Sequence, residues 1–274
     1  MKKFEVTSET KTGRLGQTLY RIKSCISFVT VSGYEVKKGD FGGWVEKEDN
    51  LSQDGKAWIR DNAEVSDNAE ICDNAEIFDN AKVFVNAVIS GNAEVGGNAR
   101  VFYNAKIRDS AKIFVNAEIC DNAEICGSAE VWGNAKVWGN ARIYDNAKIC
   151  GSAEIYGKAK IYGNAVIYGN ANVFDDAEIC GDVEVCGDAV ISKNAYIFSL
   201  KHLMCVSPFP INGHPVNLTM FRTKEGEINI QFDHNPVKSI DEFKAFIDTF
   251  CEISDRLALI TIVELGKRCI DLTA

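Results

Sequence analysis

Histidine is the side chain that most often acts as a general base or a zinc ligand near neutral pH, and this chain has three. All of them, His202, His214 and His234, lie in the last third of the sequence. His202 closely follows a long central repeat and is the one candidate for chemistry at the end of that repeat. A structural or solvated role is far commoner for a single histidine, and we expect that role for His202.

Aspartates form a second group that could do chemistry, because stacked carboxylates can ligate calcium through oxygen. Asp61 and Asp79 are the outer members of an evenly spaced set, with Asp67 and Asp73 between them. No EF-hand or glycine-rich calcium-binding repeat accompanies these residues, and glycine takes the place of aspartate further along the chain. We therefore expect neither a metal ion nor a cofactor.

Cysteine is frequent in this chain, with ten residues, but its positions do not predict a disulfide framework. Several cysteines, such as Cys72, Cys120 and Cys126, occupy a variable position of the repeat at irregular intervals. This pattern favours reduced thiols in a cytosol. Since no histidine or basic partner can be assigned to them from the sequence, we expect no nucleophilic thiol.

The element that must position these residues is a repeat of six. Isoleucine or valine occupies every sixth position from Ile59 to Ile197, which makes 24 consecutive units, and the unit reads aliphatic, variable, Asp or Gly, Asn, Ala, charged. In each short strand the alanine and the aliphatic residue point to one side. Asn and Gly, which tolerate left-handed backbone, turn the corner. Three units close one coil, so the repeat predicts eight triangular coils with parallel strands.

This pattern resembles the hexapeptide repeat of left-handed parallel β-helices, as found in acyltransferases and γ-class carbonic anhydrases. The resemblance implies a left-handed coil, a departure from the usual right-handed crossover, and assembly as a homotrimer. The enzymes with this fold use a histidine base between subunits, or three histidines that bind zinc on the coils. The repeat of this chain contains no histidine and no inserted loop, so we expect no acyl transfer from acetyl-coenzyme A.

Aromatic residues recur in an outward position of the repeat, directly after Ile or Val. Read once per coil, they form one face, a secondary face and a third. Apolar strips of this size are commonly contact surfaces, and we expect self-association through the first face. The first face contains Phe84, Phe102, Trp138, Tyr156 and Phe174, and the secondary face contains Phe78, Phe114, Trp132 and Tyr168.

The two ends of the chain lack the repeat. Residues 1–57 are expected to form an N-terminal cap, residues 58–198 the β-helix, and residues 199–274 a small α+β domain. In the C-terminal region, Pro208, Pro210 and Pro215 mark a connection, a hairpin spans 217–232, and Ser239 and Glu242 form a capping box before a helix over 243–253. A second segment, over 256–272, favours helix, although its middle is also typical of a strand.

Both ends extend the resemblance over nearly the whole chain. The stretches TLYRI, KKGDFGGWVEKEDNLS and MFRTKEGEINI followed by SIDEF are similar to a group of hexapeptide-repeat proteins encoded by phages and prophages. This resemblance implies the architecture and a phage setting, and it carries over no functional residues.

Composition narrows the function further. The net charge is −9 with mixed signs along the repeat, which argues against nucleic acid, and neither a membrane span nor a signal peptide is recognisable. We predict a cytoplasmic, non-catalytic binding or structural module that self-associates and presents a rigid surface to a host protein, as an inhibitor or decoy. The alternatives are a protein that sequesters a small molecule between subunits and an acyltransferase-like enzyme. We expect residues 199–274 both to seal the coils and to carry the partner-specific surface.

Overall fold

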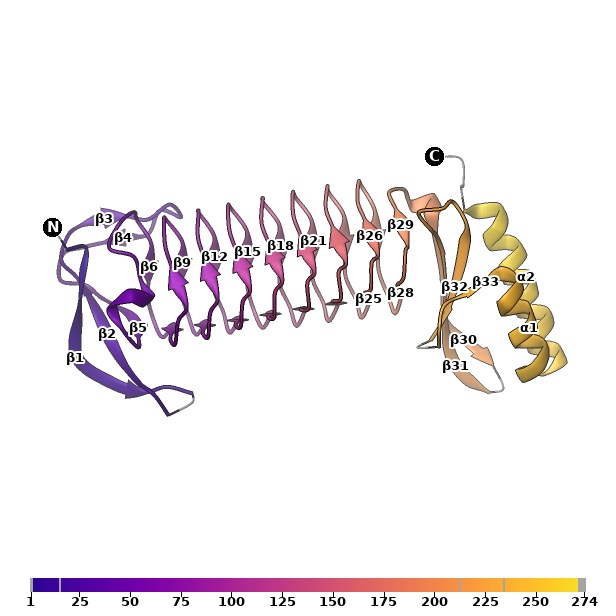
Figure 1. Ribbon diagram of the computed structural model, residues 1–274, viewed down its shortest axis with the longest axis horizontal. Helices are drawn as coiled ribbons and strands as arrows, with labels where there is room; N and C mark the ends of the chain where they lie inside the picture. Colours follow the sequence, from indigo (N-terminus) through magenta and orange to yellow (C-terminus); the bar gives the residue numbers. More distant parts are fainter. Residues whose placement is uncertain (1, 15, 212, 234, 271–274) are drawn as a thin grey trace. The chain divides into compact units, whose positions relative to one another are not determined.

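The computed structural model describes residues 2–14, 16–211, 213–233 and 235–270. The chain is a parallel β-solenoid of about nine turns, followed by a small domain of antiparallel strands and two helices (Figure 1). It divides into two units, residues 1–146 and residues 147–274. The first unit contains the N-terminal strands and the first part of the solenoid, and the second contains the later coils and the C-terminal domain.

The first unit begins with strands outside the repeat. They are β1 (Phe4–Thr12), β2 (Thr18–Ser24), β3 (Phe28–Val29), β4 (Glu35–Val36) and β5 (Phe41–Val45), followed by the 3-10 helix η1 (Glu48–Asn50). β1, β2 and β5 pair antiparallel, and β5 then pairs in parallel with the first strands of the solenoid. The N-terminal hairpin is thereby joined to the solenoid as an extension of one of its sheets.

An additional turn explains why the solenoid has about nine turns where the repeat predicts eight. Val45 pairs with Val65, and Leu51 forms a parallel bridge with Ile71. The partners in each pair are two positions further apart in sequence than partners within the repeat, so the period of six does not include Val45 and Leu51. Their side chains are nevertheless buried, in line with the aliphatic column.

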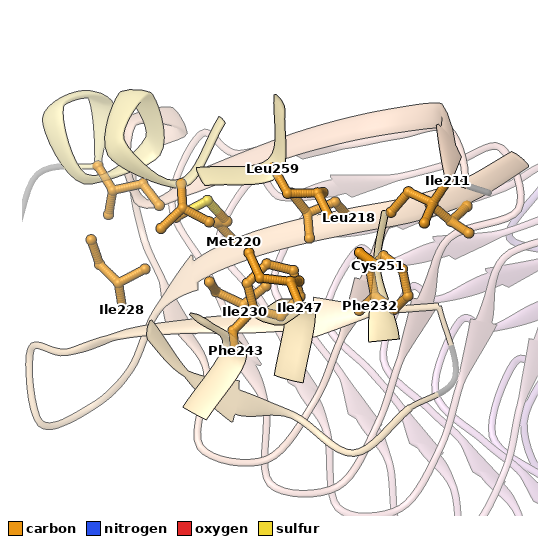
Figure 2. Close-up of a cluster of buried hydrophobic side chains, with 13 residues drawn as sticks. Ile211, Leu218, Met220, Ile228, Ile230, Phe232, Phe243, Ile247, Cys251 and Leu259 are labelled. Carbon is orange, nitrogen blue, oxygen red and sulfur yellow. The ribbon is translucent and has the colours of Figure 1, made fainter. Parts of the chain in front are cut away.

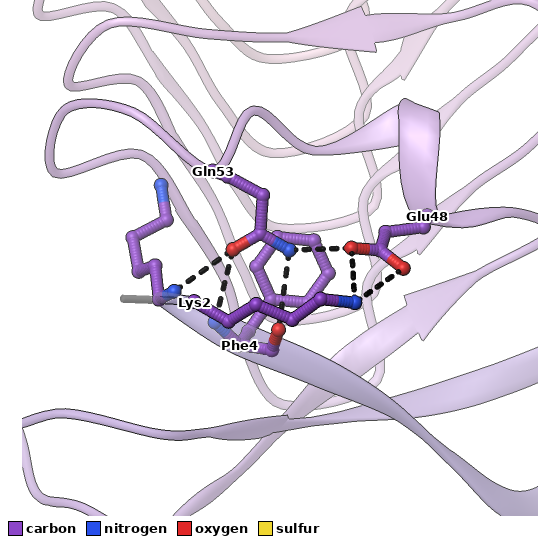
Figure 3. A network of polar contacts seen from close by, with 5 residues as sticks. Lys2, Phe4, Glu48 and Gln53 are labelled. Atoms are coloured by element: carbon purple, nitrogen blue, oxygen red, sulfur yellow. Dashed lines mark hydrogen bonds and ion pairs between the residues drawn. The ribbon is translucent and has the colours of Figure 1, made fainter.

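The side chain of Gln53 links the start of β1 to this first turn through hydrogen bonds (Figure 3). Its Oε1 accepts hydrogen bonds from the backbone N–H of Lys3 and Phe4, at 2.8 and 3.3 Å, while its Nε2 donates to the Phe4 carbonyl and to Glu48. The Glu48 carboxylate also accepts from Lys2 Nζ at 2.9 Å, which lowers the pKa of Glu48. One amide side chain thus satisfies backbone groups of β1 that would otherwise be unpaired at an open end.

The coils of the first unit consist of two-residue strands joined by corners. Strands one coil apart pair in register and form three parallel sheets, β5-β7-β10-β13-β16-β19, β8-β11-β14-β17-β20 and β6-β9-β12-β15-β18. Their bounds are β6 Trp58–Ile59, β7 Glu64–Val65, β8 Glu70–Ile71, β9 Glu76–Ile77, β10 Lys82–Val83, β11 Val88–Ile89, β12 Glu94–Val95, β13 Arg100–Val101, β14 Lys106–Ile107, β15 Lys112–Ile113, β16 Glu118–Ile119, β17 Glu124–Ile125, β18 Glu130–Val131, β19 Lys136–Val137 and β20 Arg142–Ile143.

The interior and the corners follow the repeat. Every Ile or Val of the column from Ile59 to Ile143, and the alanine two positions before it, is at most 1% exposed. Corner positions have positive φ, as at Asp109 (φ 61°) and Gly127 (φ 68°). Asn side chains bond along the corners, for example Asn116 Nδ2 to Asn134 Oδ1 at 3.0 Å. The left-handed position is the residue before each Asn, mostly Asp or Gly, so the expectation that the asparagines themselves take this backbone is wrong in the described residues; their side chains bond between coils instead.

Asp109 allows the corner geometry to be tested. Its Oδ2 accepts from the backbone N–H of Gly127 at 3.1 Å. We expect Asp109→Ala to destabilise the protein by about 1 kcal/mol more than Asp109→Gly, because both variants lose this bond but only alanine is strained at positive φ. Chemical denaturation of the two variants measures the difference. Equal midpoints would show that the corner backbone is not constrained.

In the second unit the same register continues. Its parallel sheets have the orders β21-β24-β27, β22-β25-β28 and β23-β26-β29. The bounds are β21 Lys148–Ile149, β22 Glu154–Ile155, β23 Lys160–Ile161, β24 Val166–Ile167, β25 Asn172–Val173, β26 Glu178–Ile179, β27 Glu184–Val185, β28 Val190–Ile191 and β29 Tyr196–Ile197.

The C-terminal domain is a four-stranded antiparallel sheet with two helices. After the 3-10 helix η2 (Leu200–His202), its elements are β30 (Leu203–Ile211), β31 (His214–Arg222), β32 (Ile228–Phe232), β33 (Lys238–Ser239), α1 (Ile240–Phe250) and α2 (Ile253–Cys269). The predicted hairpin is confirmed as β31 and β32, and the capping box of Ser239 and Glu242 opens α1. The segment over 256–272, for which the sequence allowed either helix or strand, is helical in its described part, since α2 includes its Ile/Thr/Val-rich middle.

One expectation for this region is wrong. Pro208 and Pro210 do not mark a connection but lie in β30, and Pro215 lies in β31. β30 is the edge strand of its sheet, where a residue without an N–H can be accommodated on the unpaired side. A register shift between Val206 and Phe209 brackets the first of these prolines.

The sheet packs against the last coil of the second unit. Thr219 Oγ1 accepts from the Val190 N–H at 3.1 Å, and Lys193 Nζ donates to the Val237 carbonyl at 2.8 Å. Ile191 and Ile197, in the last coil, are fully buried. On the domain's own side, Leu218, Met220 and Ile230 join residues of both helices in one apolar cluster (Figure 2). The domain therefore covers the end of the coils and has a hydrophobic core of its own.

Candidate functional site

The first aromatic face begins in the first unit with two stacked rings. Phe84 and Phe102, which follow β10 and β13, have ring centroids 4.9 Å apart and planes within 1° of parallel. The guanidinium of Arg14, from the tip of the β1–β2 hairpin, lies 5.9 Å from the Phe84 ring, and that of Arg100 lies 5.4 Å from Phe102. Both phenylalanines are half-buried, because each ring covers part of the other and a cation covers more.

The same stacking occurs in the second unit. Tyr156 and Phe174 have centroids 4.8 Å apart and planes 2° from parallel, and burial raises the pKa of Tyr156. Trp138, the remaining residue of the predicted face, is half-buried in the first unit. The structure thus brings neighbouring rings together as the register predicts. Whether all five residues act as one contact surface stays a prediction.

The secondary face contains a contact that sequence reasoning missed. Phe78 and Phe114 are two coils apart, yet their ring centroids are 5.9 Å apart. The position between them is Gly96, and a Cβ there would collide with the Phe78 ring. Phe78 fills the space above the glycine, and Arg60 covers the ring from 4.2 Å. The sequence signal for this contact was Gly96, a glycine at an outward position that is aromatic in the coils on either side.

The other two residues of the secondary face complete its description. Trp132 is half-buried in the first unit, and Tyr168 is 37% exposed in the second. On both faces, the rings that pair within the chain cover part of one another's surface.

The corner aspartates have a structural use. Asp61 Oδ2 accepts from the backbone N–H of Asp79 at 3.3 Å, and Asp67 and Asp73 accept from the corresponding corner residues of the next coil at 3.1 and 2.9 Å. Each carboxylate therefore stabilises the corner of the next coil. In the described part of the chain, no group of three or more His, Cys, Asp or Glu residues is placed to hold a metal ion.

Neither His202 nor the Cys120 thiol lies in surroundings that activate it for catalysis. His202 is 1% exposed, its Nδ1 accepts from the Phe198 N–H at 3.3 Å, and its ring packs edge-on against Phe198 at 4.1 Å. His214 is exposed at the start of β31, and His234 lies outside the described residues. Burial raises the pKa of Cys120 to about 11, so this thiol is protonated at neutral pH.

Open clefts in each unit have mixed charge. One of about 560 Å³ in the second unit is bordered by Lys158, Asp175 and Lys193, and one of about 650 Å³ in the first unit is bordered by Lys2, Glu5 and Lys23. Lys193 Nζ and Lys2 Nζ are already bonded to the Val237 carbonyl and to Glu48. Neither cleft presents a converging set of groups of one kind.

In the described part of the chain, four of the five most exposed large apolar side chains are on the C-terminal helices, and the fifth is Leu200. Phe250 at the end of α1 is 64% exposed, and Ile253, Leu257 and Leu265 on α2 are 74%, 63% and 55% exposed. Phe250 also packs against Phe246, with centroids 5.0 Å apart. We call Ile253, Leu257, Thr261, Leu265 and Cys269, which recur at every fourth position along α2, the α2 stripe.

The position of α2 on the sheet explains why the stripe faces solvent. Leu259, Val263 and Gly266 form the buried side of the helix, and a Cβ at Gly266 would lie 2.5 Å from the sulfur of Met220 on β31. Residues on the opposite side of a helix packed this closely cannot reach the sheet. Several large apolar side chains left in water on one side of a helix mark a contact surface, so the α2 stripe is the best candidate for a docking surface.

Comparison of the sequence with protein-family models gives no match, and comparison with the curated proteins gives none either. Neither helix in the described part of the C-terminal domain is long and apolar enough to cross a bilayer. The function must therefore be argued from the surfaces of the chain itself.

Proposed function

We propose that this protein is a non-catalytic binding scaffold that self-associates through the helices of its C-terminal domain. The observation that carries the proposal is the exposure of Phe250, Ile253, Leu257 and Leu265, each more than half exposed. Covering a leucine removes about 1.5–3 kcal/mol of unfavourable hydration, so four such side chains favour a contact. The structural contacts of His202 and the raised thiol pKa of Cys120 support a role without catalysis.

The resemblance of the repeat supplies the finer parts of the proposal. On that resemblance we assign the coils to the left-handed hexapeptide class and the chain to a phage or prophage setting. The rigid column would then display the C-terminal domain to a protein of the bacterial host, as an inhibitor or decoy. The competing assembly is self-association through the aromatic faces, which the spacing of the repeat predicts, as the trimer that the resemblance suggests.

Two matched charge substitutions separate these surfaces. We expect Leu257→Glu, on the α2 stripe, to weaken self-association at least tenfold, because each copy would bury a charge at the contact. Phe84→Glu, on the aromatic face, should leave the assembly unchanged. Sedimentation velocity at micromolar concentrations measures both. If Phe84→Glu dissociated the assembly and Leu257→Glu did not, the aromatic face would be the interface and the helix proposal would be wrong.

A further inference from the structure

We infer that the α2 stripe pairs with the same stripe of a second copy, with the helices antiparallel and a two-fold axis at Thr261. This inference rests on the proposed self-association and specifies its geometry. The starting observation is that all five residues of the α2 stripe are exposed, and that they extend over the whole of α2 from its first residue to its last.

The stripe has the symmetry that such a contact needs. A two-fold interface uses the same patch on both copies, so residues at equal distances from the axis must fit one another. Thr261 is the middle residue of α2, Leu257 and Leu265 lie four positions to either side, and Ile253 and Cys269 lie eight to either side. Antiparallel pairing therefore places leucine against leucine, with the smaller threonine where the helices come closest. Four residues turn about 40° beyond a full turn of the helix, so Ile253 and Cys269 lie on opposite flanks of this contact, outside its centre.

The sides of the stripe fit the same arrangement. Small residues, Ser254 and Ala258, border one side and allow the helix backbones to approach. The other side carries Arg256, five positions before Thr261, and Glu264, three positions after it. The two-fold axis brings Glu264 of one copy to within about 3 Å, measured along the helix axis, of the level of Arg256 in the second copy. A parallel pair would instead place Arg256 beside Arg256 and Glu264 beside Glu264.

Each of these charges already has an exposed partner within the chain. Arg256 lies 3.5 Å from Asp248, and Glu264 lies 3.0 Å from Lys244. The contact between copies would therefore add a second ion pair to each of these side chains. These added pairs would fix the register of the two helices, while the charges stay neutralised within each copy. One helix pair also covers less than the roughly 800 Å² per partner of a standard interface, so we expect a reversible dimer that forms at micromolar concentrations.

Cysteine cross-linking of the full chain tests the register. We expect Thr261→Cys to form a disulfide-linked dimer under mild oxidation, because the two positions meet at the axis. Ser254→Cys is the matched control, since its two copies would be about 21 Å apart, far beyond the reach of a disulfide. The unsubstituted chain, treated alike, gives the background from native thiols.

The outcomes separate this inference from the proposed function. A dimer band for Thr261→Cys at least tenfold above that of Ser254→Cys supports the two-fold axis. Equal bands would overturn it. If the chain self-associates but Thr261→Cys gives no link, the register is wrong and the proposed self-association stands. If the unsubstituted chain stays monomeric at every concentration, both are wrong.

Discussion

Removal of residues 199–274 is expected to produce chains that aggregate or form filaments. In the intact protein, Ile191 and Ile197 are fully buried, and the last coil is bonded to the C-terminal domain, as in the 3.0 Å bond from the Lys224 N–H, in the turn between β31 and β32, to the Asn194 carbonyl. Without the domain these isoleucines face water, at about 25 cal/mol for each Å² of apolar surface. The freed edges of β27, β28 and β29 can then pair with another chain.

A matched deletion distinguishes the loss of the cap from the loss of chain length. Deleting residues 94–111 removes one coil and leaves the repeat in phase and both ends covered. We expect this variant to remain dispersed while the truncated chain forms large particles, as measured by dynamic light scattering and electron microscopy. If the truncated chain stayed dispersed with the assembly state of the intact protein, the C-terminal domain would not be a cap.

Shortening one aliphatic side chain inside the solenoid is expected to have the largest effect of any single substitution considered. Ile119 is fully buried and stands between Val101 and Val137 in adjacent coils. Ile119→Ala should cost about 2–5 kcal/mol, because the stacked coils on either side cannot collapse into the space. Ile119→Val, which places a residue already found in the column, should cost about 0.5–1.5 kcal/mol.

Denaturation measures the size of this destabilisation, and hydrogen exchange should show which strands lose protection. Because each coil contacts only its neighbours, loss of protection is expected to concentrate in β13, β16 and β19, whose strands pair with one another in register. A cost for Ile119→Ala no larger than that for Ile119→Val would show that the interior is loosely packed.

The repeat specifies the solenoid because its information is local and periodic. Ile, Val and Ala set the inside of each coil, an Asp or Gly before Asn sets most corners, and a constant step of three units sets the pairing of strands, all of which can be read along the chain. The first turn of the solenoid could not be predicted from the repeat, because Val45 and Leu51 pair with residues 20 positions later, where partners within the repeat are 18 positions apart. The prolines misled because an edge strand accommodates Pro208 and Pro210, and Pro215 is only the second residue of its strand.

The candidate site was harder to predict because it depends on packing between distant segments. The spacing of Phe84 and Phe102 predicts that the rings meet, but not how far stacking and the nearby Arg14 cover them. On α2, apolar residues occur on every side, so the sequence does not show which side meets the sheet. The contact of Gly266 with Met220 decides this and leaves the α2 stripe exposed.

The mass of the intact protein in solution tests the central claim most directly. The chain has a mass of 30.1 kDa, so sedimentation equilibrium at rising micromolar concentrations should approach twice that value, about 60 kDa. A mass near three times that of the chain would point to the trimer through the aromatic faces and contradict the helix contact. A mass that remains at 30.1 kDa across the whole range would contradict self-association altogether.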